Sequence, residues 1–356
     1  DDAMRYAKSS VDRDRIPALE RLAVMADEGD WDQKIEGMQL MVHRGVLSVI
    51  TCYLSPAYDS HVALQHAALK LLRTIIVNTA ADTAVSLGRA LCDLELLKAL
   101  VQAAVRLARH AGPAENAALS LTTLKHVVGD ILSYDAACLR ELPRWVRADG
   151  GVIPALIDCA VDPVNPMEVA MAAGTTLVNL WCSDCDIDVA APVLPLLKKA
   201  LQCREHVLDA MGAICEIARM EGGAVGSALG PSFGAGLVVA HGVVGDIASI
   251  MADDRPHYAQ QYGLLTLIRV CKASNAHKWH VARCGVLNAL PLAPESWQAA
   301  NATSVLQALI ANEDGEMLRH ILKEAPDAVP ALIRGMNDPN CRTRDQRLCC
   351  LKDMVR

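Results

Sequence analysis

A short glycine–valine motif returns along the chain at an almost constant interval, and this repetition limits the fold more than any other feature. Gly-Val or Gly-x-Val pairs occur at residues 45–46, 150–152, 242–243 and 285–286. The later valines that open an apolar stretch are separated by 41, 50, 43 and 43 residues, at Val152, Val193, Val243, Val286 and Val329. A period of about 40–47 residues is typical of stacked helical repeats. We therefore expect a row of similar helical units rather than separate compact domains.

Residues 150–184 show the most complete pattern of a single unit. Pro154 stands in the first turn of an expected helix, where proline is tolerated, and apolar residues then recur at helical spacing. Residues 162–166 (DPVNP) break this helix, and residues 167–180 begin a second helix rich in alanine and leucine. This stretch resembles an armadillo repeat, whose usual pattern is GG-x-I-P-x-L, a short break, and then A-A-x-x-L-x-N-L.

The resemblance implies an all-α fold, a right-handed α-solenoid of about eight armadillo-like units that bury their apolar faces against one another. We expect one repeat domain over residues 1–356, with units at residues 16–42, 43–80, 90–133, 150–184, 192–220, 240–274, 282–314 and 325–354. Residues 221–236 are expected to be a Gly-rich insertion in a mobile loop, either merely tolerated or ordered by a partner. Residues 139–149 are expected to form an irregular connection with an exposed Trp145.

Composition agrees with packed helices and excludes some classes of protein. The chain is 52% hydrophobic but only 3% aromatic, so small aliphatic side chains must fill the core. The net charge of −7 argues against a nucleic-acid binder, and no apolar run reaches the roughly 18 residues of a membrane span. Thirteen cysteines, an odd number, lie mostly singly in apolar stretches, which favours a reducing, cytoplasmic compartment. The absence of an initiator Met is consistent with an excerpt of a longer protein; homo-oligomerisation is left open.

The armadillo resemblance also implies a place for binding. In peptide-binding members of that family, a Trp and an Asn four residues apart on each lining helix hold an extended peptide. Asn78 and Asn179 occupy the Asn position here, but other residues hold the Trp position. We therefore expect a non-enzymatic scaffold or adaptor that presents a concave groove to a protein partner, including as a subunit of a larger cytoplasmic or cytoskeletal assembly. An importin-like receptor for an extended peptide signal is the alternative. The expected groove residues are Arg73, Asn78, Lys125, Asn179, Glu216, Arg219, Arg269 and Lys272.

The cysteines form two patterns that resemble chemical sites. Residues 181–185 (WCSDC) resemble the thioredoxin motif, but Cys182 and Cys185 follow a helix, where the helix dipole has the wrong sign to activate a thiol. With Cys203 and His206 they match a zinc spacing, although the intervening helix should hold the two pairs apart. We expect no cofactor; a metal or redox role through Cys182 and Cys185 is the lesser alternative. A second cluster, expected to combine core thiols with exposed histidines, consists of Cys271, His277, His280 and Cys284.

Overall fold

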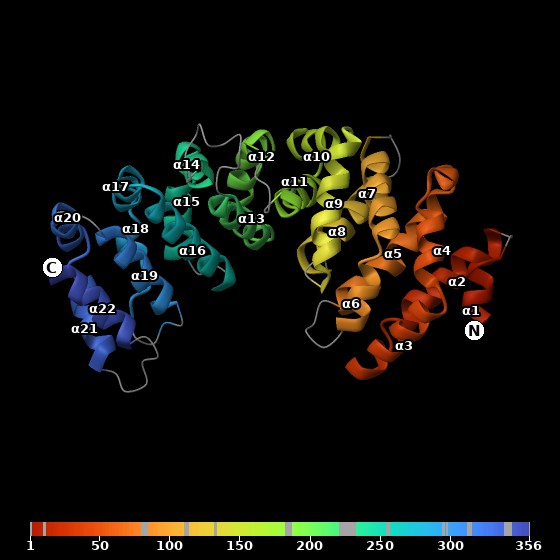
Figure 1. The fold of residues 1–356 in the computed structure, drawn as a ribbon, viewed down its shortest axis with the longest axis horizontal. Helices are drawn as coiled ribbons and strands as arrows, with labels where there is room; N and C mark the ends of the chain where they lie inside the picture. Colours follow the sequence, from red (N-terminus) through yellow and green to blue (C-terminus); the bar gives the residue numbers. More distant parts are fainter. Residues whose placement is uncertain are drawn as a thin grey trace. The chain divides into compact units, whose positions relative to one another are not determined.

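The structure, a computed structural model, consists of helices joined by turns (Figure 1). It describes residues 2–9, 12–79, 85–109, 114–131, 134–181, 187–220, 233–253, 257–293, 296, 298–311, 315–337 and 344–355, and these residues contain no strand. The chain divides into two compact units, Asp1–Leu180 and Trp181–Arg356.

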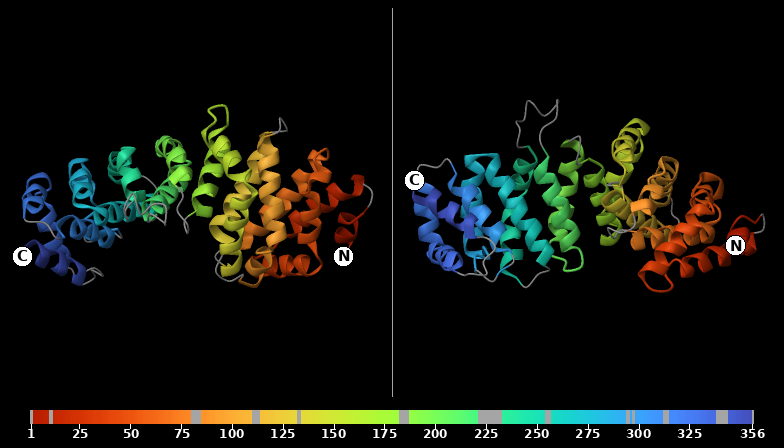
Figure 2. Two further views of the ribbon diagram at one scale, coloured as in Figure 1. Left: turned by 45° about the horizontal axis from the view of Figure 1, so that its top comes forward. Right: turned by 60° about the horizontal axis from the view of Figure 1, so that its bottom comes forward.

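The unit Asp1–Leu180 is a stack of helical repeats (Figure 2). Its helices are α1 (Asp2–Ala7), α2 (Asp12–Met25), α3 (Trp31–His43), α4 (Val46–Tyr53), η1 (Pro56–Tyr58), α5 (Val62–Thr79), α6 (Val85–Leu91), α7 (Leu94–Arg109), α8 (Ala114–His126), the π-helical turn η2 (Val127–Ile131), α9 (Ala136–Asp149), α10 (Val152–Val161) and α11 (Met167–Trp181). A complete repeat has a first, a second and a third helix, as in α3, α4 and α5. The third helices α2, α5 and α8 pack in succession, and so do the second helices α4, α7 and α10. Each repeat thereby buries its apolar face against the next.

The unit Trp181–Arg356 repeats the same arrangement. Its helices are α12 (Ile187–Ala200), α13 (Val207–Arg219), α14 (Phe233–Ala240), α15 (Val243–Ala252), α16 (His257–Ala273), α17 (Asn275–Arg283), α18 (Val286–Ala289), α19 (Ala299–Ile310), α20 (Glu316–Glu324), α21 (Ala328–Asn337) and α22 (Arg344–Val355). The third helices α13, α16, α19 and α22 pack in succession, and the second helices α15 and α18 also pack together.

A left-handed glycine joins the first helix of several repeats to the second. Gly45 precedes α4 with φ of 86°, Gly242 precedes α15 with φ of 65°, and Gly285 precedes α18 with φ of 79°. A side chain would be strained at such positive φ values, which explains the glycine. The valine that follows each of these glycines is fully buried. The Gly-Val motif of the sequence therefore marks the turn and the first core residue of the second helix.

Aliphatic side chains and thiols fill the core, as the shortage of aromatic residues predicts. On α5, Leu69, Leu72 and Ile75 are fully buried. Cys215 and Cys271 are buried among them and act as small apolar residues. Within the described residues no single helix is both long and apolar enough to cross a membrane; α14 and α15 pass that test only as a pair, and the pair is bent by 77°.

Two expected loops are helical where the structure describes them. Residues 139–149 lie in α9, whose N-cap Asp135 accepts hydrogen bonds from the first backbone N–H groups of the helix. Trp145 is half-buried, and Lys98 Nζ lies 5.9 Å from the centre of its ring, so the expected exposed loop is wrong. Residues 233–236 of the expected Gly-rich insertion belong to α14, whereas residues 221–232 lie outside the described residues.

The N-terminal helices do not pack as the expected unit at residues 16–42 would require. That unit joins α2 to α3, but α2 packs against α1 and α5, whereas α3 packs against α4, α5 and α6. The reason is that α2 is the third helix of one repeat and α3 is the first helix of the next. The other expected unit boundaries stay a prediction.

Candidate functional site

Two adjoining clefts open on the third helices of the unit Asp1–Leu180. The first has a volume of about 480 Å³ and lies between α5, α8 and the start of α11. The second has a volume of about 490 Å³ and lies between α2 and α5. Lys70 of α5 lines both of them. They therefore form one continuous row, called the paired clefts below.

A histidine in the first cleft is held in a defined orientation. Asn116 Nδ2 donates to Val62 O at 3.1 Å, so Asn116 Oδ1 points to His66, whose Nδ1 lies 2.7 Å away. An amide oxygen only accepts, so His66 Nδ1 carries the proton. The other ring nitrogen, Nε2, faces Glu115 with its carboxylate oxygen at 3.8 Å. The imidazole therefore presents its Nε2 to a carboxylate in the cleft.

Basic side chains from α5 face carboxylates from neighbouring helices in the first cleft. Lys70 and Arg73 are exposed and lie four and seven residues after His66, on one face of the helix. Glu115 and Glu168 line the same cleft. Arg73 is a predicted groove residue, and the structure places it in the lining. Sequence analysis missed His66 and Lys70, although their helical spacing to Arg73 was available to find them.

The second cleft is acidic. Glu20, Asp27 and Glu28 line it beside the lysine that it shares with the first cleft. Asp27 Oδ1 accepts from Lys34 Nζ at 2.7 Å and from Asn78 Nδ2 at 3.3 Å. These hydrogen bonds, that of Lys34 above all, hold the pKa of Asp27 below its usual value. Asp27 is therefore a fixed negative charge near neutral pH.

The other predicted groove residues of this unit do not line the paired clefts. Asn78 Nδ2 donates to Ala26 O at 3.2 Å, just beyond the end of α2. This amide therefore ties one third helix to the preceding one. Lys125 of α8 and Asn179 of α11 are half-buried. The structure thus brings Arg73, but not these three residues, to the cleft surface.

Four predicted groove residues lie in the unit Trp181–Arg356, on the neighbouring helices α13 and α16. Glu216 and Arg219 form an ion pair with an O···N distance of 2.5 Å. Arg269 Nη1 donates to Cys215 O and lies 3.0 Å from Cys215 Sγ. Lys272 is exposed. The structure brings the four side chains to adjacent third helices, but three of them are engaged in contacts within the chain.

Of the two cysteine patterns, the structure describes only the one around α17 in full. Cys182 and Cys185 lie outside the described residues, so the structure does not reach the thioredoxin-like and zinc-like spacings. Burial raises the pKa of Cys271 to about 12. His277 and His280 are half-buried, so their expected exposure is wrong; burial, and next the charge of His280, lower the pKa of His277. Among the described residues, no three His, Cys, Asp or Glu side chains converge on one metal position.

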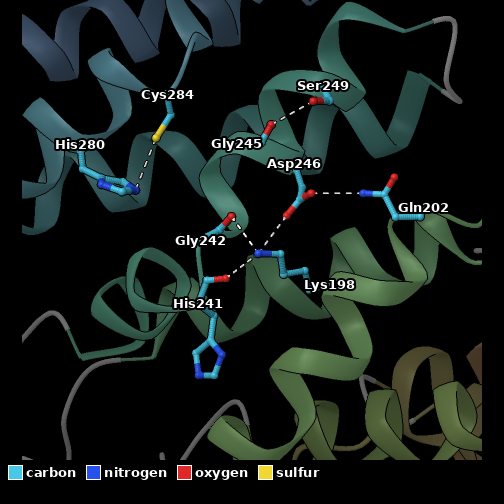
Figure 3. Close-up of polar contacts among 9 residues, drawn as sticks. All are labelled: Lys198, Gln202, His241, Gly242, Gly245, Asp246, Ser249, His280 and Cys284. Carbon is cyan, nitrogen blue, oxygen red and sulfur yellow. Dashed lines mark hydrogen bonds and ion pairs between the residues drawn. The ribbon is translucent and has the colours of Figure 1, made fainter.

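A lysine or arginine at the end of a second helix reaches the glycine turn of the next repeat. Lys198 Nζ of α12 donates to His241 O at 2.9 Å and lies 3.7 Å from Asp246 Oδ2 of α15 (Figure 3). Carbonyl groups at the end of a helix lack intrahelical partners, and such cations cap them. These residues hold adjacent repeats together, so their charges are structural. In the other unit, Lys8 Nζ donates to the carbonyl of Arg44, the C-cap of α3, and Arg109 Nη2 donates to the carbonyl of Gly151, the N-cap of α10, both at 3.1 Å.

Solved structures identify this arrangement of stacked helices. The chain is similar to a computationally designed armadillo repeat protein for modular peptide recognition, with 18% identity and a TM-score of 0.56, over 71% of this chain and 99% of that one. The chain has an armadillo-like repeat fold. The chain is also similar to the crystal structure of an engineered protein, with 14% identity and a TM-score of 0.52, over 72% of this chain and 98% of that one. Comparison with protein-family models and with curated proteins gives no match.

The armadillo-like fold explains why the paired clefts continue from one repeat to the next. Third helices of successive repeats pack side by side, roughly 8–10 Å apart. Residues at similar positions of neighbouring third helices therefore meet, although they are far apart in the sequence. Asn116 and Val62, for example, are hydrogen-bonded across 54 residues of chain. Clefts on adjacent helices adjoin for the same reason.

Proposed function

We propose that this chain is a non-enzymatic interaction scaffold and that its paired clefts hold an extended segment of a partner protein. The observation that carries the proposal is the continuity of the clefts, which share Lys70 and extend from α2 across α5 and α8 to α11. An armadillo-like fold supports a role in protein interaction. The designed armadillo protein that resembles this chain is described as one for peptide recognition, which agrees with the same role.

The size of the paired clefts fits a short extended segment. Three steps between helices that pack roughly 8–10 Å apart span about 27 Å. An extended chain rises about 3.3 Å per residue, so about eight residues cross this distance. A linear peptide of that length is therefore a suitable model for the partner.

The charges of the paired clefts determine which peptides fit. Glu20, Asp27 and Glu28 line the end at α2 and favour a basic residue there. Arg73 and Lys70 favour an acidic residue over α5, between that end and Glu168. The preferred segment therefore carries charges of both signs in a fixed order.

A selection from a library of displayed linear peptides tests the proposal. We expect the intact chain to enrich peptides whose binding is lost in the double variant Lys70→Glu/Arg73→Glu. Both side chains are exposed, so the variant should keep its stability within about 0.5 kcal/mol. Arg144→Glu is the matched control because Arg144 is an exposed arginine of α9, and α9 lines neither cleft.

Two outcomes would contradict the proposal. One is the enrichment of no peptide by the folded chain. The other is the enrichment of peptides that bind the double variant as tightly as the parent chain. Loss of binding in the Arg144→Glu control would place the site outside the paired clefts.

An importin-like receptor for a basic signal peptide is the alternative, and the acidic side chains of the second cleft favour it. The use of the Asn78 amide within the chain speaks against it, because that amide is the peptide-binding group which the resemblance implies. A basic signal peptide added to the selection would separate the two. Binding that depends on Glu20 and Glu28, but not on Arg73, would favour the importin-like role.

We also propose that the protein works in a reducing compartment. All ten of the cysteines that the structure describes are free thiols, and most of them are buried. The net charge of −7 supports protein partners rather than nucleic acid.

A further inference from the structure

The repeat made of α20, α21 and α22 carries most of the exposed apolar side chains of the unit Trp181–Arg356. In the described part of this unit, seven large apolar side chains are exposed, and four of them lie on these three helices. The four are Leu322, Ile333, Leu348 and Val355, with exposed fractions of 40–88%. The outer face of a terminal repeat is usually polar because it faces water. A concentration of exposed apolar side chains therefore indicates a surface that binds another protein.

The third helix of this repeat, α22, is covered along one side only. The helices α19 and α22 are both 12 residues long, but α19 buries eight residues, whereas α22 buries only Arg347, Cys350 and Met354. The reason is that α19 lies between the third helices α16 and α22, whereas α22 packs against α19 and its own second helix, α21. In the part of the chain that the structure describes, no further repeat packs on α22 (Figure 1). The side of α22 that faces away from its three buried residues is therefore open.

The open side of α22 carries charges in a self-complementary order. Asp345 and Lys352 are both exposed and are seven residues apart, which is almost two helical turns, so they lie on one line along the helix. Leu348 and Cys349 are exposed as well and lie midway between them, one on each side of that line. Along the helix, this face therefore presents an acid, an uncharged centre and a base. Reversing the helix direction exchanges the acid with the base.

We propose that the open side of α22 binds the same side of α22 in a second copy of this chain. In a two-fold symmetric dimer the two helices run antiparallel, and every contact occurs twice. A two-fold axis that passes between Leu348 and Cys349 places Asp345 of each copy opposite Lys352 of the other copy. The leucine then packs against its symmetry mate, and the cysteine against its own. Two ion pairs thus enclose an apolar centre.

The charges select this pairing over other arrangements of the same two helices. In a parallel pair, Asp345 would face Asp345 of the second copy, and Lys352 would face Lys352, so like charges would repel. In an antiparallel pair shifted by one turn, neither carboxylate would face a lysine of the other copy. The antiparallel pair with matched charges is isologous, so it closes as a dimer and leaves no free end for a fibre.

Sedimentation equilibrium of the intact chain measures its self-association, and we expect a reversible dimer. The single variants Asp345→Lys and Lys352→Asp should each weaken the dimer roughly 10-fold or more, because two-fold symmetry introduces two like-charge pairs at once. The double variant Asp345→Lys/Lys352→Asp exchanges the two charges and should restore the dimer.

The double variant also separates the interface from an effect on the helix itself. Asp345 lies in the first turn of α22 and Lys352 in the last, so both charges favour the helix dipole. An effect on helix stability alone would therefore be largest in the double variant, whereas the interface predicts recovery there. Circular dichroism should show the same helicity in all variants, because both side chains are exposed.

Two leucine variants provide the matched comparison. Leu348→Asp should abolish the dimer, because it places two carboxylates together at its centre. Leu139→Asp should leave the dimer intact, because Leu139 is similarly exposed, at 43% against 40%, but lies on α9 in the other unit. The proposal is overturned if the parent chain is monomeric, if the dimer survives Leu348→Asp, or if the double charge exchange fails to restore it. Loss of the dimer in Leu139→Asp would overturn it as well.

Discussion

Gly234 is the position where the smallest change should have the largest effect on the unit Trp181–Arg356. The backbone of α14 approaches α13 so closely at this residue that Gly234 N–H donates to Met220 O at 3.3 Å. A Cβ atom on Gly234 would lie 1.8 Å from Ile217 O and 2.9 Å from the carbonyl carbon of Ile217. These are backbone atoms of the neighbouring helix, so no side-chain rotation removes the clash. Gly234→Ala should therefore force α14 away from α13.

Gly245→Ala is the control for Gly234→Ala, and comparison of the two variants gives the expected change in the free energy of unfolding. Gly245 lies near the start of α15, as Gly234 lies near the start of α14, and a Cβ there meets no atom within 4 Å. Replacing a helical glycine by alanine stabilises a helix by roughly 0.5–1 kcal/mol in both variants. Overpacking costs about 1–3 kcal/mol, and only Gly234→Ala suffers it. We expect Gly245→Ala to stabilise the unit and Gly234→Ala to destabilise it, with a difference between them of about 1–3 kcal/mol.

Guanidinium unfolding followed by circular dichroism measures this difference. Because the chain has two compact units, its unfolding need not be two-state. Hydrogen exchange of the α13 and α14 amides therefore assigns the change to the contact between these helices. The reasoning is refuted if Gly234→Ala is as stable as Gly245→Ala, or if exchange accelerates elsewhere and not in α13 and α14.

Three further predictions follow from other contacts. Arg269→Ala should lower the free energy of unfolding by about 1.5–3 kcal/mol, because it removes a charged hydrogen bond to Cys215 O; Lys272→Ala, at an exposed site, should change it by less than about 0.5 kcal/mol. The pKa of Asp27 is lowered in the fold, so the ionised carboxylate stabilises the fold above the unfolded pKa near 3.8, and this effect is lost as the pH falls below that value. Urea unfolding at several pH values should show that the difference in the free energy of unfolding between the parent and Asp27→Asn shrinks in that range. Brief alkylation followed by mass spectrometry should label the exposed Cys52 long before Cys271, whose burial raises its pKa to about 12.

The repeats and their glycine turns were predictable because short segments determine them. Gly45 and Gly242 stand where the backbone needs a positive φ, and a buried valine follows each of them. Such a local requirement leaves the same short motif in each repeat. The spacing of this motif predicted the stacked helices, and the solved structures confirm the armadillo-like fold.

The first helix of each repeat was harder to predict. The sequence predicts an irregular connection at residues 139–149 and a Gly-rich loop that includes residues 233–236, yet these residues lie in α9 and α14. Proline and glycine within a short stretch normally favour a loop, but Pro143 lies inside α9, and Gly234 and Gly236 lie inside α14. The repeat length does not indicate whether a first helix is present, since units of two and of three helices share a period of about 40–47 residues.

The candidate site was only partly predictable, because polar residues of a third helix have two different roles. Asn78 contacts a backbone carbonyl just beyond the preceding third helix, and Arg269 contacts one within it, 52 and 54 residues earlier in the chain. His66 and Lys70 line a cleft instead. All four lie on third helices. A local sequence pattern cannot tell whether such a side chain bonds within the chain or lines a cleft. The distance from the side chain to a backbone carbonyl of another repeat decides between the two roles.

This difference determines which variants can test the groove. Arg269→Glu removes a positive charge, but it also breaks the hydrogen bond between α16 and α13. Loss of partner binding in that variant would therefore not distinguish a lost contact from a displaced helix. Lys70 and Arg73 are exposed, so their substitution changes the charge of the paired clefts while the packing of α5 stays intact. A loss of binding confined to these residues would locate the partner on the paired clefts, which no substitution of Arg269 can do.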